Sequence, residues 1–126
     1  MYNILEKKDN LKIKEYRKKW NLAGQGKYLP DYPLHLNFEL TFGCNLSCEF
    51  CVYSLPLNEW GYKVDPKKKI SFEKYCEIID DGVKYGLCSV ALNGNNEPLI
   101  NKDINRFIDY SIEKGILEVS LHTNGS

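Results

Sequence analysis

The chain has 126 residues, of which 43% are apolar and 13% aromatic, so its length and composition fit one globular domain that can bury a core. Its 17 lysine and arginine residues balance 17 aspartate and glutamate residues, which excludes the protein-wide positive charge of non-specific nucleic-acid binders. Neither a long apolar run nor a signal-like amino terminus is present in the sequence, which predicts a cytoplasmic protein without a membrane partner.

The amino-terminal part of the chain is basic. Residues 1–28 carry a net charge of +5, which leaves −5 for the remainder. An amphipathic helix is expected over roughly 10–21, and its less polar side consists of Leu11, Ile13, Tyr16 and Trp20. We interpret its lysines as a solvated face in preference to a nucleic-acid or anionic-substrate surface. We assign 1–33 to this helix and a linker, and 34–126 to the main domain.

Beyond the linker, strand, loop and helix patterns alternate. The expected elements are a strand over 34–41, a helix over 72–85 with Ser71 as its N-cap, a strand over 88–92, a helix over 103–114 and a strand over 117–122. This order is typical of parallel strands joined by right-handed crossovers. Loops that carry chemistry in such sheets gather at the carboxyl ends of the strands. Three unusual loops of this chain follow strands in that way: the loop with three cysteines over 44–51, the Asn-rich turn over 93–98 and the Thr-Asn-Gly segment at 123–125.

The alternating residues of the strands predict which side chains face the helices. Those expected to pack against helices are Leu34, Leu36, Phe38 and Leu40 in the first strand, and Val119 and Leu121 in the third. Those expected on the opposite face are His35, Asn37 and Glu39, and Glu118, Ser120 and His122. We expect this polar face to line an interior that holds a substrate; a solvent-facing sheet accounts for it equally well.

The five cysteines of the chain are unevenly placed. Cys44, Cys48 and Cys51 fall within eight residues, whereas Cys76 and Cys88 stand alone and are predicted to be small buried hydrophobic residues. An odd number of cysteines in a chain without an export signal does not suggest a disulfide framework. Clustered thiolates instead favour zinc or an iron–sulfur cluster.

Three ligands from one loop leave one coordination position unfilled. That is a defect for structural zinc unless His35 or His122 supplies a fourth ligand, so zinc stays open at this point. For a catalytic cluster the open position is useful, because an iron without a protein ligand can hold a substrate or cofactor.

The spacing Cys44-x3-Cys48-x2-Cys51 after a first strand, with Phe50 just before the last cysteine, resembles the signature of radical S-adenosylmethionine (SAM) enzymes. The segment from Gly94 to Pro98 stands where that family has a Gly-Gly-Glu-Pro loop. Thr-Asn-Gly at 123–125 resembles the motif that often ends its third strand. Residues 16–20 and 33–41 resemble the lead-in of the subgroup that often carries a C-terminal SPASM domain. The resemblance covers about 16–125.

The resemblance implies that Cys44, Cys48 and Cys51 bind a 4Fe-4S cluster whose fourth iron chelates SAM. The implied cofactor contacts are Phe50, Gly94, Asn95, Asn96, Glu97 and Asn124. Phe50 would lie near the adenine, with ordinary loop packing as the alternative, and the 94–98 loop would meet the methionyl amino group through backbone carbonyls. The catalytic side chains are unknown.

The resemblance also implies a reaction. An electron from a low-potential donor such as flavodoxin or ferredoxin would cleave SAM to methionine and a 5′-deoxyadenosyl radical. That radical would abstract hydrogen from an unknown substrate, for which a peptide is one candidate.

Asn95 and Asn96 depart from the family pattern, which has glycine there. Asparagine tolerates the left-handed backbone region better than most residues, so we expect the turn to survive. A plain Asn-rich turn is the alternative.

The fold class expected from these observations is α/β: about three βα units, the first half of a partial parallel (β/α)6 barrel, preceded by a short helix. We expect a truncated form or a gene fragment that is inactive by itself, with an exposed strand edge that favours self-association. Two alternatives remain: a small zinc- or iron–sulfur-binding structural or interaction module, and a catalytically inactive half-barrel.

Overall fold

A computed structural model describes residues 11–51 and 68–126 of the chain. It contains a sheet of three parallel strands, β1 (His35–Asn37), β2 (Ser89–Ala91) and β3 (Glu118–Ser120), in that spatial order. The parallel α/β arrangement predicted from the sequence is confirmed. Each paired strand is shorter than its alternating pattern, and the residues that follow it enter the loops at the carboxyl edge of the sheet.

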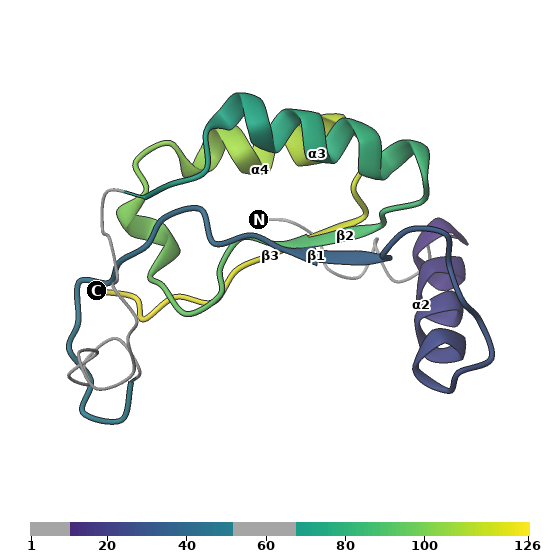
Figure 1. The fold of residues 1–126 in the computed structure, drawn as a ribbon, viewed down its shortest axis with the longest axis horizontal. Coiled ribbons are helices and arrows are strands. Elements are labelled where there is room, and N and C mark those ends of the chain that lie inside the picture. The colour runs from purple at the N-terminus through teal and green to yellow at the C-terminus, as the bar shows by residue number, and fades with distance from the viewer. Residues whose placement is uncertain (1–10, 52–67) are drawn as a thin grey trace.

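Helices α3 (Phe72–Lys84) and α4 (Ile104–Glu113) cover one face of the sheet (Figure 1). Helix α3 begins where predicted, because Ser71 caps it by accepting a hydrogen bond from the backbone N–H of Lys74 at 3.1 Å. A 3₁₀ helix, η2 (Pro98–Ile100), lies between β2 and α4 and was not predicted. The Glu97 side chain accepts a hydrogen bond from the Leu99 N–H at its start.

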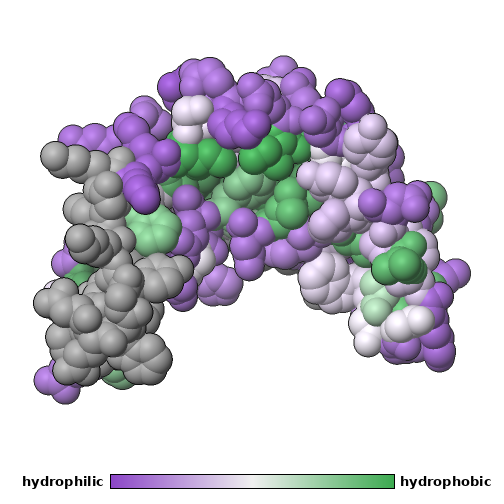
Figure 2. All heavy atoms as spheres, viewed as in Figure 1, coloured by the Kyte–Doolittle hydropathy of each residue, from purple (hydrophilic) through white to green (hydrophobic). Residues whose placement is uncertain are grey.

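The core lies between the sheet and these two helices, where Figure 2 shows apolar side chains beneath a hydrophilic outer surface. Aromatic rings form its centre: Tyr75 packs edge-on against Phe38 at 4.7 Å and against Phe107 at 4.9 Å between ring centroids. Of the side chains predicted to face the helices, Phe38 and Leu40 belong to this core, and Leu36, Val119 and Leu121 pack against it. Leu34 is buried but lines a pocket with Trp20. The predicted face assignment of β1 and β3 is therefore confirmed.

Helix α2 (Leu11–Gly24) lies beyond the amino ends of the strands and extends away from α3 and α4 (Figure 1). It ends three residues later than the pattern predicted. Its one buried residue, Tyr16, is 3% exposed, and its hydroxyl lies 2.8 Å from the hydroxyl of Ser89 at the start of β2. Arg17 forms an ion pair with Glu118 of β3 at 2.7 Å, so the helix is tied to both strands.

The prediction that Cys76 and Cys88 are buried is wrong, because both side chains are partly exposed. Cys76 lies near the surface of α3, and the Cys88 thiol donates to the carbonyl of Gly86 at 3.3 Å. Desolvation still raises the pKa of each thiol. Among the described helices, none has the length and apolar character needed to cross a bilayer.

Candidate functional site

The three unusual loops meet at the carboxyl edge of the sheet. The backbone N–H of Glu97, in the loop after β2, donates to the carbonyl of Gly43, just before the first cysteine, at 3.0 Å. Asn124, after β3, donates from Nδ2 to Oδ1 of Asn45 in the cysteine loop at 2.9 Å. Residues about 80 positions apart in the sequence are thereby brought together.

Glu97 joins the loop after β2 to the loop after β3. Its side chain accepts three hydrogen bonds: Oε1 from the Thr123 hydroxyl at 2.8 Å and from the Leu99 N–H at 3.0 Å, and Oε2 from the Asn124 N–H at 2.8 Å. The residue is only 3% exposed. Burial acts to raise the pKa of Glu97, but the three donors together outweigh it and hold the pKa below its ordinary value. Glu97 is therefore an ionised carboxylate that links the loop after β2 to the loop after β3.

The turn at 94–96 is held by a carboxylate that the sequence analysis assigned to a different role. Glu39, two residues beyond β1, accepts through Oε1 from the Asn95 N–H at 2.9 Å. A Cβ atom on Gly94 would lie 2.6 Å from Cγ of Glu39, so only glycine fits without movement. Glu39 thus contacts this loop, and its expected place in a substrate-holding interior stays a prediction. The signal that could have revealed it was a glycine after β2 opposite a carboxylate after β1.

Asn96 is buried at 9% exposed, and its Oδ1 accepts from the Gly94 N–H at 3.1 Å. Its Nδ2 is buried without a hydrogen-bond partner among the described residues. In the described part of the chain only glycines have positive φ, and Gly94 is not one of them. Asn95 and Asn96 therefore do not have positive φ, so the turn at 94–96 forms without the left-handed backbone region that asparagine tolerates.

The three clustered cysteines are free thiols on one loop: Cys44 is exposed, and Cys48 and Cys51 are partly exposed. The Cys51 N–H donates to the carbonyl of Cys48 at 2.9 Å, which makes a tight turn between them. Soft, unpaired sulfur ligands of this kind fit an iron–sulfur cluster. Within residues 11–51 and 68–126, no three Cys, His, Asp or Glu side chains lie close enough together to hold a metal ion. Cluster binding would therefore require the loop to draw its sulfurs together.

Phe50 is 91% exposed, so its ring is not packed into the described part of the chain. The histidines considered as a fourth zinc ligand do not join the cysteines. His35 lies at the amino end of β1, where Nδ1 is 2.7 Å from the Ser89 hydroxyl and Nε2 is 3.0 Å from Oδ1 of Asn37. His122 is exposed, and its backbone N–H donates to Oδ1 of Asn93 at 2.8 Å.

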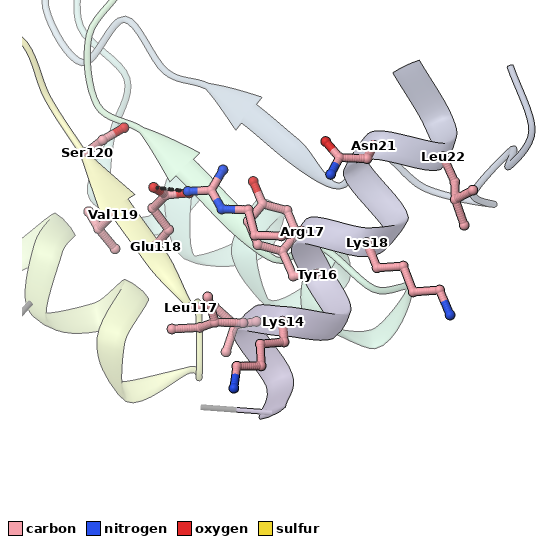
Figure 3. A pocket seen from close by; sticks show the side chains of 11 residues that line it. Lys14, Tyr16, Arg17, Lys18, Asn21, Leu22, Leu117, Glu118, Val119 and Ser120 are labelled. Atoms are coloured by element: carbon pink, nitrogen blue, oxygen red, sulfur yellow. Dashed lines mark hydrogen bonds and ion pairs between the residues drawn. The ribbon is translucent and has the colours of Figure 1, made fainter. Parts of the chain in front are cut away.

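A cavity of about 860 Å³ opens between α2 and β3, and Figure 3 shows the Arg17–Glu118 ion pair beside it. Its lining includes Tyr16 and also Glu118 and Ser120, two residues of the polar face predicted to line a substrate-holding interior, but none of the predicted metal or cofactor residues. We do not assign it to the candidate site, because the motifs lie at the carboxyl edge.

Comparison with models of protein families gave no match. Among curated proteins, the chain is 32% identical over 93 residues to the GTP 3′,8-cyclase of Desulforamulus reducens, which covers 72% of the chain and 27% of that protein. It is 25% identical over 126 residues to the subtilosin biosynthesis protein AlbA of Bacillus subtilis, covering 100% and 26%. It is 32% identical over 95 residues to the mycofactocin maturase MftC of Mycolicibacterium smegmatis, covering 75% and 22%. The chain thus spans about a quarter of the length of these relatives.

Among solved structures, the crystal structure of BtrN in complex with AdoMet and 2-DOIA matches with a TM-score of 0.59. The match covers 77% of this chain and 38% of that one, at 16% identity. The likeness shows that the two proteins share a fold over the matched part of the chain.

Proposed function

We propose, for a chain that belongs by sequence and by fold to the radical SAM superfamily, that Cys44, Cys48 and Cys51 bind a 4Fe-4S cluster used to cleave SAM. The observation that carries the proposal is the convergence at one sheet edge of the cysteine loop, the 94–98 loop and the Thr-Asn-Gly segment. No contact between these three segments is required by the βα repeat itself. A site assembled at this edge explains all three motifs together.

The bound cluster would take an electron from a donor such as flavodoxin or ferredoxin and would supply it for the reductive cleavage of SAM to methionine and a 5′-deoxyadenosyl radical. The chain's own residues position the reactants. Backbone carbonyls of the 94–98 loop would bind the methionyl amino group, and Glu97 and Glu39 keep that loop in place through the hydrogen bonds described above. Phe50, which is exposed at the surface, would pack on the adenine. The enzyme is an oxidoreductase in this scheme.

We propose a peptide as the substrate class. The match to AlbA, a bacteriocin biosynthesis protein by name, runs through the whole chain, including the basic helix α2. The match to the cyclase of Desulforamulus reducens covers 72% of the chain. The longer shared stretch supports a peptide over a nucleotide. Stimulation of SAM cleavage by GTP in the purified protein would contradict this choice.

The test of the proposed function is anaerobic reconstitution with iron and sulfide, followed by metal analysis and EPR of the reduced protein with and without SAM. About four irons per chain, with a signal that shifts when SAM is added, are expected. Cys48→Ser should abolish the cluster, whereas the matched control Cys88→Ser should retain it. Stoichiometric zinc, or a cluster whose signal ignores SAM, would leave a binding module or an inactive half-barrel.

A further inference from the structure

Asn124 follows β3 and has every polar atom of its carboxamide engaged. Its Oδ1 accepts from the backbone N–H and from the hydroxyl of Ser126, each at 3.0 Å. Its Nδ2 donates to Oδ1 of Asn45 at 2.9 Å. Because the backbone N–H of Ser126 can only donate, the carboxamide oxygen must face Ser126 and the nitrogen must face the cysteine loop.

The remaining hydrogen of Nδ2 is available to a sulfur atom. Nδ2 of Asn124 lies 3.7 Å from Sγ of Cys44, and the backbone N–H of Leu46 approaches the same sulfur at 3.5 Å. The backbone N–H of Asn124 is held by Glu97 at 2.8 Å. The residue is thus fixed from both sides with its amide toward the first cysteine of the cluster loop.

We propose that Asn124 is a positioning residue whose Nδ2 donates a hydrogen bond to the Cys44 sulfur and raises the reduction potential of the cluster, an inference that rests on the proposed function. Reduction adds negative charge to the cluster and its sulfur ligands. A donor aimed at a ligating sulfur stabilises the reduced state more than the oxidised state, and hydrogen bonds to sulfur are among the factors that set cluster potentials.

The same geometry separates this role from a direct side-chain contact with SAM. Both hydrogens of Nδ2 are used, one by Asn45 and one by Cys44, and Oδ1 is occupied by Ser126. A SAM atom that bonded this carboxamide would have to displace one of these partners. The sulfur contact leaves Asn45 and Ser126 in place as partners of the carboxamide.

The experiment is an EPR-monitored redox titration of the anaerobically reconstituted protein, as wild type, Asn124→Ala and Asn124→Asp. Asp has the shape of Asn and keeps an acceptor for Ser126, but when ionised it cannot donate to sulfur. The control is Ser126→Ala, which removes a hydroxyl that donates to Oδ1 and leaves Nδ2 in place. Iron and sulfide content are measured for each protein, so that cluster loading is known independently of the potential.

At a fixed solution potential, we expect the ratio of reduced to oxidised cluster to fall roughly threefold to tenfold in Asn124→Ala, the factor that one hydrogen bond contributes. A tenfold change corresponds to about 59 mV for a one-electron couple. Asn124→Asp should show a larger fall, because it also adds negative charge, and Ser126→Ala should titrate like the wild type.

Three outcomes would overturn the inference. A loaded Asn124→Ala cluster with the wild-type potential would refute the sulfur contact while leaving the proposed function intact. Loss of the cluster in both Asn124 variants would assign the residue to loop assembly instead. A wild-type chain that assembles no cluster would refute the proposed function, and this inference with it.

Discussion

Replacing Glu97 with glutamine tests whether an ionised carboxylate holds the loops together. The amide keeps one acceptor oxygen, so at least one of the three donors, such as the Asn124 N–H, would face an NH₂ group. A hydrogen bond to a charged group contributes about 1.5–3 kcal/mol, and the remaining bonds lose their charge assistance. We expect Glu97→Gln to lower the free energy of unfolding at pH 7 by about 2–4 kcal/mol. At roughly 4 °C per kcal/mol for a domain of this size, the melting temperature should fall by about 8–16 °C.

The pH dependence sharpens the test of Glu97. Because its folded pKa lies below the ordinary value of 4.5, its stabilisation is fully present above that pH and is lost as pH falls through the folded pKa. The difference in the free energy of unfolding between wild type and Glu97→Gln, measured by urea denaturation with circular dichroism, should therefore be widest near pH 7. It should shrink as the pH falls below about 4.5. The exposed Glu113→Gln is the matched control and should leave stability unchanged. The same difference in free energy of unfolding at pH 3 and pH 7 would show that the ionised Glu97 carboxylate does not hold the loops together.

Two further substitutions test the turn and the core. Gly94→Ala should lower the free energy of unfolding by about 1–3 kcal/mol, because the new Cβ would lie 2.6 Å from Cγ of Glu39. In urea denaturation this loss should shrink when Glu39→Ala is added, and strictly additive losses would contradict the clash. Burial raises the pKa of Tyr75 to about 12 from an ordinary value of 10.0, so stability present below pH 10 should decline as pH rises toward 12. Tyr75→Phe should flatten that alkaline decline. If the free energy of unfolding falls with pH equally steeply in wild type and Tyr75→Phe, the phenol does not titrate with unfolding.

The fold could be predicted from the sequence because its signals are local. The N-cap Ser71 begins α3, and Gly86, with φ of +99°, follows its end, so both limits are written within a few residues of the helix. The alternation through Phe38 and Leu40 likewise depends only on neighbours along the strand. The η2 helix was missed because its start depends on Glu97, which acts both as its cap and as the partner of another loop.

The position of the candidate site could be predicted, and its internal contacts could not. Motif spacing and the rule for parallel sheets place the three loops at one edge. The partner of Glu39 lies 56 positions later and the partner of Cys44 lies 80 positions later, so no local pattern reports either pairing. Asn124 was expected to contact SAM from its motif alone, and the direction of its carboxamide becomes visible only once β3 is placed beside β2.

The role of Glu97 in holding the loops together and the role of Asn124 as a donor to Cys44 are linked by one hydrogen bond. The Asn124 N–H donates it to Oε2 of Glu97. If that bond holds the Asn124 amide against Cys44, Glu97→Gln should lower the cluster's reduction potential in the same direction as Asn124→Ala, at a temperature where the variant remains folded. The double variant should then have no lower potential than Asn124→Ala alone, because the donor that Glu97 positions is already gone. The losses of folding stability, in contrast, should be dominated by Glu97. A potential that rises in Glu97→Gln, measured by the same EPR titration, would show that Glu97 acts on the cluster through its own charge and not through Asn124.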